Sequence, residues 1–319
     1  MKRPRGLLRT LLLSVVVVTE LVPAFSHGPA TIAVVLSRDI APYREALRGF
    51  EAGLQGNLRQ IRLVEYNIET SSHDPAGLIE KIQSRKPTLI LTLGSAATAL
   101  VSDAIRDVPI VFSLVLPSSG RSSLEDLRAS RGNITGASME VPVGTQFETI
   151  RQVLPGAKRI GVLFDPAVSG SLIETARRVA SEKGFELVSF AVSSENDVVR
   201  KMGEVDGNVD VLWSVADSTV FSPQGLKHIL LSTLRSRIPF VGLSPSFVKA
   251  GALLALSCDY EDVGRQSGEL AERILAGEEP ARIPTAVPRA VSLSLNMNTA
   301  RQIQVTLSEG VERKAEIVF

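Results

Sequence analysis

Small and polar residues recur where short apolar runs of the sequence end, and together they could bind a small solute. These residues are Ser37, Ser95 with Ala96, Ser113, Asp217 with Ser218, and Ser244. A serine hydroxyl donates and accepts hydrogen bonds, and the first turn of a helix offers backbone N–H groups to a carboxylate or a phosphate. Each such residue is also a common cap or turn former. Their recurrence at the ends of successive runs favours the binding interpretation.

A hydrolase site is the main catalytic alternative, and the sequence argues against it. Residues 242–246 read GLSPS, which resembles the nucleophile elbow G-x-S-x-G but ends in serine where that motif has glycine. Pro245 would remove a backbone N–H of the oxyanion hole, and His228 precedes the serine, against the hydrolase order. The acidic residues that come closest to a catalytic set fit a solvated face better: Glu140, Glu261 and Asp262. The sequence therefore predicts a protein that is not an enzyme.

Composition and motifs disfavour metals, cofactors and nucleic acids. Cys258 is the single cysteine, so neither an intrachain disulfide nor a cysteine-based zinc site can form. The three histidines, His27, His73 and His228, lie far apart in the chain. No G-x-G-x-x-G segment follows the first apolar run after residue 30, and no phosphate-loop motif occurs. The net charge of +1 is too balanced for a general nucleic-acid binder. We expect no metal, no cofactor and no nucleic-acid partner.

The first 26 residues have the layout of a secretory signal peptide. Basic residues within the first nine precede an apolar run at 11–18, and Ala24 and Ser26 occupy the −3 and −1 positions of a cleavage site before His27. The run is too short to cross about 30 Å of hydrocarbon. No cysteine near this point could carry a lipid anchor. We expect residues 1–26 to be removed and the mature protein to be periplasmic and not membrane-embedded.

The chain after residue 30 alternates strand-like and helix-like segments. The strand-like runs of the first half lie at 31–36, 61–66, 89–93 and 110–112. The run at 31–36 is continuously apolar, as expected for a strand buried on both faces. Helical patterns separate the runs, and Asp74 followed by Pro75 gives one helix a cap and a first residue. This alternation predicts a parallel sheet.

The same order of segments recurs in the second half. Residues 160–164 (IGVLF) mirror residues 32–36 (IAVVL) 128 positions later. Residues 238–241 (IPFV) mirror residues 108–111 (VPIV) 130 positions later. Two nearly equal offsets predict two lobes of the same architecture.

The second half also contains the predicted edge of a binding cleft. Its first helix is predicted to begin at Ser171, with Glu174 completing a capping box, and a strand-like run at 209–214 precedes Asp217. Ligands of parallel sheets bind beyond the carboxyl ends of the strands. We therefore predict an α/β protein with two similar doubly wound parallel-sheet lobes and a ligand cleft between them.

A series of short segments is similar to one known family. The segments are DVPIVF at 107–112, GNITG at 132–136, KRIGVLF at 158–164, ADSTV at 216–220, KAGA at 249–252, and Asp259-Tyr260 followed by Gly264-Arg265, together with the C-terminal stretch 296–317. In this order and spacing they resemble the ABC-transporter substrate-binding family of the tryptophan-binding TrpX type. The resemblance covers essentially the whole chain after the signal peptide.

This resemblance implies the type I periplasmic-binding-protein fold, in which two α/β lobes joined by three crossovers close on a ligand. On this basis we expect lobe 1 to comprise residues 27–116 plus 246–280, and lobe 2 to comprise residues 117–245 plus 281–319. The helix at 261–276 should then pack on the first lobe.

The resemblance also implies ligand contacts, and the strand ends add further candidates. The implied contacts are Ser95, Ala96, Ser113, Ser171, Asp217, Ser218 and Asp259; the added candidates are Ser37, Tyr43, Ser169 and Ser244. Gly170 precedes Ser171 where relatives often have asparagine, and Ala41 precedes Pro42 where many have histidine. An asparagine offers both a donor and an acceptor, so its absence predicts a changed ligand preference.

The resemblance implies an exported solute-binding protein that delivers its ligand to an ABC permease and its ATPase. The alternative is a periplasmic receptor that docks on a membrane sensor kinase or cyclase, because both use ligand-dependent lobe closure. Only 5% of the residues are aromatic, so few rings could sandwich a sugar. Tyr43 and Tyr260 could lie near the cleft, whereas Trp213 falls in a strand and is interpreted as core. We expect a small polar or amphipathic solute, such as an amino acid, bound by a monomer.

Overall fold

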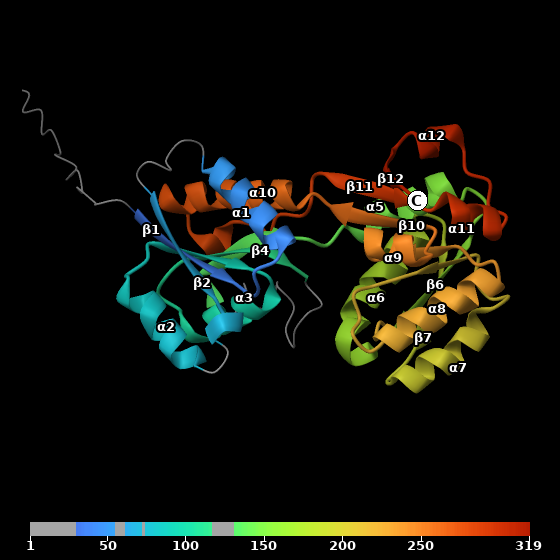
Figure 1. The fold of residues 1–319 in the computed structure, drawn as a ribbon, viewed down its shortest axis with the longest axis horizontal. Helices are drawn as coiled ribbons and strands as arrows, with labels where there is room; N and C mark the ends of the chain where they lie inside the picture. The colour runs from blue at the N-terminus through green and yellow to red at the C-terminus, as the bar shows by residue number, and fades with distance from the viewer. Residues whose placement is uncertain (1–29, 55–60, 72–73, 117–130) are drawn as a thin grey trace, which may run out of the picture.

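The computed structural model describes residues 30–54, 61–71, 74–116 and 131–319. These residues form two α/β lobes set side by side along the long axis of the molecule (Figure 1). The predicted signal peptide, residues 1–26, lies outside the described residues. Across the described ranges, no helix combines the length and the apolar character needed to cross a bilayer.

The first lobe is built on a five-stranded parallel sheet of order β2-β1-β3-β4-β5. Its strands are β1 (Ala30–Leu36), β2 (Ile61–Asn67), β3 (Leu89–Leu93), β4 (Ile110–Val115) and β5 (Ile134–Ser138). Helices α2 (Pro75–Ser84) and α3 (Ser95–Ala104) pack on one face, and α1 (Ala41–Gly53) and α10 (Tyr260–Leu275) pack on the other. Short 3-10 turns lie at η2 (Glu69–Ser71) and η3 (Pro280–Arg282). Burial on both faces explains the unbroken apolar runs of the central strands.

The second lobe is built on a seven-stranded sheet of order β12-β11-β10-β9-β8-β6-β7. Its strands are β6 (Arg159–Phe164), β7 (Glu186–Ala191), β8 (Val211–Trp213), β9 (Phe240–Gly242), β10 (Leu254–Cys258), β11 (Val291–Leu295) and β12 (Ala315–Val318). Strand β11 runs antiparallel to β10 and parallel to β12. Helices α5 (Val143–Val153), α6 (Pro166–Glu182), α11 (Met297–Gln302) and α12 (Glu309–Glu312) pack on one face. Helices α7 (Glu195–Val205) and α8 (Pro223–Arg235) cover the other face, and α9 (Pro245–Ala250) links β9 to β10.

The predicted duplication is confirmed strand by strand. The order β2-β1-β3-β4-β5 of the first sheet repeats as β7-β6-β8-β9-β10 in the second. The run at 32–36 lies in β1 and its mirror at 160–164 in β6, so the two occupy the same place in their sheets. The predicted fold class, two similar α/β lobes, is therefore correct.

The two lobes exchange one helix each. After β5 the chain enters the second lobe, where Phe147 of α5 packs with Ile173 of α6. After β10 the chain returns to the first lobe, where α10 lies along α1 (Figure 1). Val263 and Leu270 of α10 belong to the same buried cluster as Phe50 of α1. Each lobe is thus completed by a helix from the other half of the sequence.

The sheet pairings correct the predicted lobe boundaries. Residues 117–245 were assigned to lobe 2, but β5 pairs with β4 in the first sheet. Residues 246–280 were assigned to lobe 1, but β10 pairs with β9 in the second sheet. Ala286, assigned to lobe 2, bridges to Ala137 of β5 in the first sheet. The boundaries were misplaced because each crossover follows a strand, and a buried strand has the same apolar pattern in either sheet.

Helix starts follow the local capping signals, with one correction. Asp74 caps α2 by accepting the backbone N–H of Gly77 at 2.9 Å, as predicted. Helix α6, predicted to begin at Ser171, instead begins at Pro166 and is capped by Asp165. The aspartate accepts a hydrogen bond from an unpaired N–H of the first helical turn, and a proline at the first position has no N–H to pair. This capping signal is stronger than that of the later serine.

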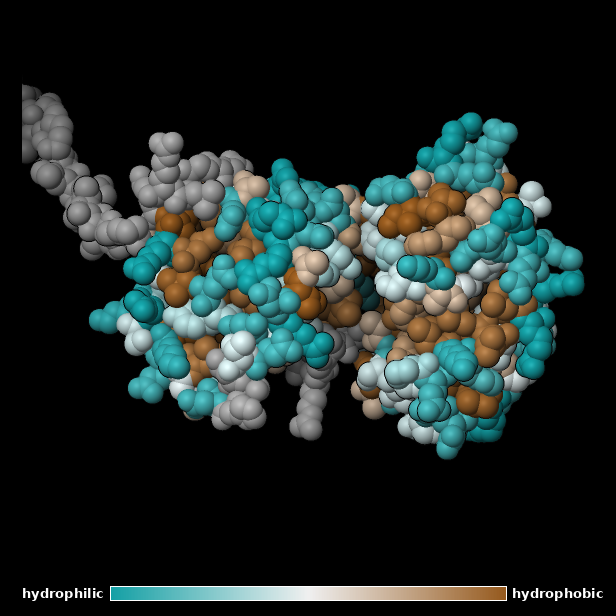
Figure 2. All heavy atoms as spheres, in the orientation of Figure 1, coloured by the Kyte–Doolittle hydropathy of each residue, from teal (hydrophilic) through white to brown (hydrophobic). Residues whose placement is uncertain are grey.

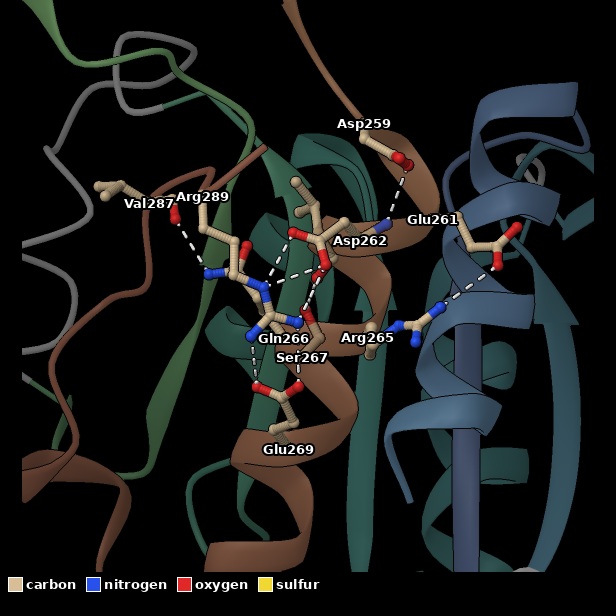
Figure 3. Close-up of polar contacts among 10 residues, drawn as sticks. Asp259, Glu261, Asp262, Arg265, Gln266, Ser267, Glu269, Val287 and Arg289 are labelled. Carbon is tan, nitrogen blue, oxygen red and sulfur yellow. Dashed lines mark hydrogen bonds and ion pairs between the residues drawn. The ribbon is translucent and has the colours of Figure 1, made fainter. Parts of the chain in front are cut away.

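The last crossover is tied to α10 by a polar cluster (Figure 3). Arg289 lies between two carboxylates of α10, with its Nη2 2.9 Å from Asp262 Oδ1 and 3.0 Å from Glu269 Oε1. One helical turn away from these contacts, Gln266 Nε2 donates to the carbonyl oxygen of Val287 at 3.0 Å. The crossover therefore follows the surface of the first lobe until it enters β11.

Candidate ligand-binding site

A cavity of about 260 Å³ lies at the junction of the two lobes. Figure 2 shows the lobes as separate masses with a hollow between them. The described residues that line the cavity come from the second lobe (Gln146, Leu172, Trp213, Ser214, Val215, Ala216, Gly242, Leu243 and Ser244) and from the crossovers and their flanks (Leu116, Met139, Glu140, Val141, Leu256, Ser257, Cys258 and Tyr260). Its position beyond the carboxyl ends of β8 and β9 is where ligands of parallel sheets bind.

An aromatic side chain held in place by its neighbours forms one wall of the cavity. Trp213, the last residue of β8, is 1% exposed, and its ring packs edge-on against Phe147 with centroids 5.1 Å apart. Trp213 Nε1 donates to Gln146 Oε1 at 2.7 Å, and Gln146 Nε2 donates to the carbonyl oxygen of Val141 at 2.7 Å. The interpretation of Trp213 as core is confirmed, and the residue also lines the cavity.

The first crossover places a carboxylate in the cavity wall. Glu140 is half-buried there. Its backbone N–H donates to Ser138 Oγ at 3.0 Å. Glu261 and Asp262 are half-buried as well, and each pairs with an arginine: Glu261 with Arg265, and Asp262 with Arg289 (Figure 3).

The single cysteine, Cys258, also lines the cavity, where its thiol is unreactive. Burial raises the pKa of the Cys258 thiol to about 12. Because thiolate is the reactive form, we expect Cys258 to resist iodoacetamide at pH 8 in the folded protein and to be alkylated rapidly in denaturant. Mass spectrometry of a time course measures this. Equal rates in both states would contradict the burial of the thiol.

Some predicted site residues gather on the first lobe, at the amino end of α3. Ser37 Oγ accepts the backbone N–H of Ala97 at 2.9 Å. The Tyr43 hydroxyl lies close against Gly94, where an added Cβ would be only 2.1 Å from it. Ser95 and Ala96 form the first turn of α3 beside them. Ser37 follows the carboxyl end of β1, and Ser95 and Ala96 follow that of β3, as predicted.

The remaining candidates are dispersed. Ser113 is fully buried in β4, and its Oγ has no hydrogen-bond partner among the described residues. Ser171 and Ser218 are exposed, and Asp259 caps α10 by accepting the backbone N–H of Asp262 at 3.0 Å (Figure 3). Ser244 is the one predicted site residue that lines the cavity.

Asp217 organises a loop of the second lobe. Its side chain is 2% exposed, and Oδ2 accepts the backbone N–H of Asp165 at 2.8 Å and the hydroxyl of Ser169 at 2.7 Å. Oδ1 accepts the backbone N–H groups of Thr219 at 3.0 Å and Val220 at 3.3 Å. Both carboxylate oxygens are thus fully used by protein donors, and Asp217 does not line the cavity.

We expect Asp217→Ala to destabilise the protein by about 1–3 kcal/mol, because it leaves buried donors without an acceptor. Thermal denaturation measures the loss. Ser218→Ala, an exposed change one residue away, serves as the control and should leave the melting temperature nearly unchanged. Equal melting temperatures for the two variants would mean that the loop does not depend on the carboxylate.

Sequence reasoning missed most of the residues that line the cavity. For Trp213 a signal existed, since an aromatic residue at the end of a strand lies where ligands of parallel sheets bind. No pattern distinguished Met139, Glu140 or Val141, because they belong to an irregular crossover. Gln146 could not be distinguished from any other polar residue on an amphipathic helix.

The two duplicated lobes and the cavity at their junction define the class of protein: a two-lobed binding protein of the type I periplasmic-binding-protein fold. The chain belongs to the family of ABC transporter substrate binding proteins, whose family model matches residues 31–319.

Several characterised proteins are similar to this chain. A tyrosine-binding protein of Clostridioides difficile is 23% identical over 247 residues, which is 77% of this chain and 71% of that protein. A Streptococcus pneumonia domain solved in complex with L-Trp has a TM-score of 0.64 at 22% identity and covers 91% of this chain and 99% of its own. A ligand-free, open substrate-binding protein from Clostridium difficile has a TM-score of 0.71 at 20% identity. The match covers 91% of this chain and 99% of that protein.

Proposed function

We propose that this protein is exported, captures a small amphipathic solute of the amino-acid class by lobe closure, and delivers it as a monomer to an ABC permease and its ATPase. The observation that carries the proposal is the cavity at the lobe junction, where Trp213, Leu172 and Met139 supply apolar wall beside polar groups. Pockets for small ligands combine apolar surface with a few polar groups in this way. The tyrosine and L-Trp named for two similar proteins support an aromatic amino acid as the solute.

Lobe closure would bring the two groups of candidate residues together. The cavity lies mainly against the second lobe, whereas Ser37, Tyr43, Ser95 and Ala96 lie on the first. The amino end of α3 suits a ligand carboxylate, because the helix dipole is positive there. We propose that rotation at the crossovers places this turn over the open side of the cavity.

A thermal-shift screen of amino acids and small carboxylates tests the proposed ligand class. A ligand present at 100 times its dissociation constant stabilises a protein by about 2.7 kcal/mol. We expect L-tryptophan or L-tyrosine to raise the melting temperature, and ribose to leave it unchanged. A protein stabilised by sugars and not by any amino acid would contradict the proposal.

Export is tested separately. We expect the mature protein in the periplasmic fraction with an N-terminus close to His27, because the basic and apolar segments before it have the layout of a signal peptide. Cell fractionation and N-terminal sequencing measure both. An intact N-terminus recovered from the membrane fraction would contradict cleavage.

A further inference from the structure

The indole N–H group of Trp213 is used within the protein. Trp213 Nε1 donates to Gln146 Oε1 at 2.7 Å, while the ring packs edge-on against Phe147 and is 1% exposed. The N–H is the single polar group of an indole side chain, and it can only donate. Because Trp213 also lines the cavity, it contributes ring surface to the wall and no free hydrogen-bond donor.

The side chain of Gln146 is held at both ends. Its Nε2 donates to the carbonyl oxygen of Val141 at 2.7 Å, just before α5 begins at Val143. Side chains of a helix point back toward its amino end, which lets Gln146 reach this carbonyl. The indole requires an acceptor and the carbonyl requires a donor, so the two partners fix a single orientation of the amide. Gln146 therefore joins the end of β8 to the end of the first crossover.

Loss of this amide would disturb the wall of the cavity. Among the described residues, Gln146 supplies the acceptor for the indole N–H. A buried N–H without a partner costs free energy, so the ring would turn toward another acceptor or admit water beside it. Gln146 and Leu172 line the cavity together with Trp213. A ring that moved would thus change the surface that a ligand meets.

We propose that Gln146 is a positioning residue for ligand binding: it holds the Trp213 ring in place, so that the apolar wall exists before the ligand arrives. The inference rests on the proposed function and adds to it a residue that sets affinity through another side chain. A preformed wall removes the cost of ordering the ring when the ligand binds. Because the indole N–H is bonded to Gln146, the ring receives the apolar part of the ligand and leaves the polar part to other groups.

A double-mutant cycle tests whether Gln146 acts through the indole. Gln146→Met keeps the length of the side chain and removes its amide donor and acceptor, and Trp213→Phe keeps a ring and removes the N–H. Isothermal titration calorimetry of the full mature chain with L-tryptophan and with L-tyrosine gives the affinities. We expect Gln146→Met to lower the affinity of the wild type by about 2- to 12-fold, as the loss of one hydrogen bond would. It should cause no further loss in the Trp213→Phe background.

The indole hydrogen bond can be observed directly, because Trp213 is the single tryptophan and a labelled sample gives one indole N–H signal in nuclear magnetic resonance. We expect this hydrogen to exchange with water slowly in the wild type and faster in Gln146→Met, whose signal should shift upfield. Gln146→Glu retains an acceptor and should keep the signal near its wild-type position.

Gln83→Met is the matched control, because Gln83 is exposed on α2 of the first lobe, away from the cavity. It should change neither the indole signal nor any affinity. Circular dichroism melting shows that the variants fold, and Gln146→Leu replaces Gln146→Met if the latter does not.

The outcomes distinguish this inference from the proposed function. Tight binding of either amino acid that Gln146→Met leaves unchanged overturns the role of Gln146 and leaves amino-acid capture intact. An equal loss of affinity in both backgrounds also overturns it, because Gln146 would then contact the ligand itself. An indole signal that Gln146→Met does not move overturns the hydrogen bond on which the role depends. Binding of neither amino acid overturns both the inference and the proposed ligand class.

Discussion

Replacing Trp213 with alanine is expected to lower the free energy of unfolding by about 3–5 kcal/mol. The side chain is 1% exposed, packs edge-on against Phe147 and hydrogen-bonds to Gln146, so its removal leaves a void and an unpaired amide oxygen. Because the void opens into the ligand cavity, the same change should weaken binding of any ligand that contacts this wall. Stability and affinity should therefore fall together.

Urea denaturation followed by far-UV circular dichroism measures the loss of stability. Fluorescence cannot be used for the variant, because Trp213 is the single tryptophan of the chain. Trp213→Phe should cost less, about 1–3 kcal/mol, since it keeps an aromatic ring but leaves Gln146 Oε1 without its donor. Leu231→Ala, at a residue that is 59% exposed, is the control and should change stability by less than about 0.5 kcal/mol. An alanine variant as stable as this control would contradict the packing of Trp213.

The second large effect is expected at the contact between α1 and α10. A Cβ atom added at Gly264 would lie 1.9 Å from the carbonyl oxygen of Ala46, and one added at Gly49 would lie 1.8 Å from the carbonyl oxygen of Glu261. Backbone atoms cannot move aside as a flexible side chain can, so the helices would have to separate. We expect Gly264→Ala to cost about 3 kcal/mol, the upper end of the usual range for overpacking.

A drop of roughly 5 °C in melting temperature corresponds to that loss for a chain of this length. Gly203→Ala is the matched control, because Gly203 lies within α7 and a Cβ there meets no atom within 4 Å. Alanine favours a helix by about 1 kcal/mol over glycine, so the control should melt slightly higher than the wild type. Two variants that both melt higher than the wild type would contradict the close approach of α1 and α10.

The sequence predicted the duplicated lobes because buried parallel strands leave a strong signal. The runs at 32–36 and 160–164 are apolar on both faces, and their matching order required no knowledge of the connections. Helix caps such as Asp74 could be predicted as well, because the capping side chain accepts an N–H group only three residues away in the sequence. The lobe boundaries could not be predicted in this way, because the crossovers after β5 and β10 depend on which sheet the next helix packs against.

The cavity was harder to predict than the sheets. Its position beyond the strand ends followed from the topology, but its lining depends on how the crossover at 139–141 and the end of β8 approach each other in space. The role of Asp217 was also hard to predict, because its hydrogen-bond partners are distant in the sequence. A polar residue after a strand fits a ligand contact, yet Asp217 is bonded by Asp165 and Ser169, which are about 50 residues distant in the chain.

The exchange of helices also sets the earliest moment at which either lobe can be completed during synthesis. The sheet of the first lobe ends at Ser138, but α10, which covers α1, ends only at Leu275. The second lobe is completed later still, because its strand β12 ends only at Val318. Domains fold as units when their last element emerges, so neither lobe can finish while most of the chain is still being made.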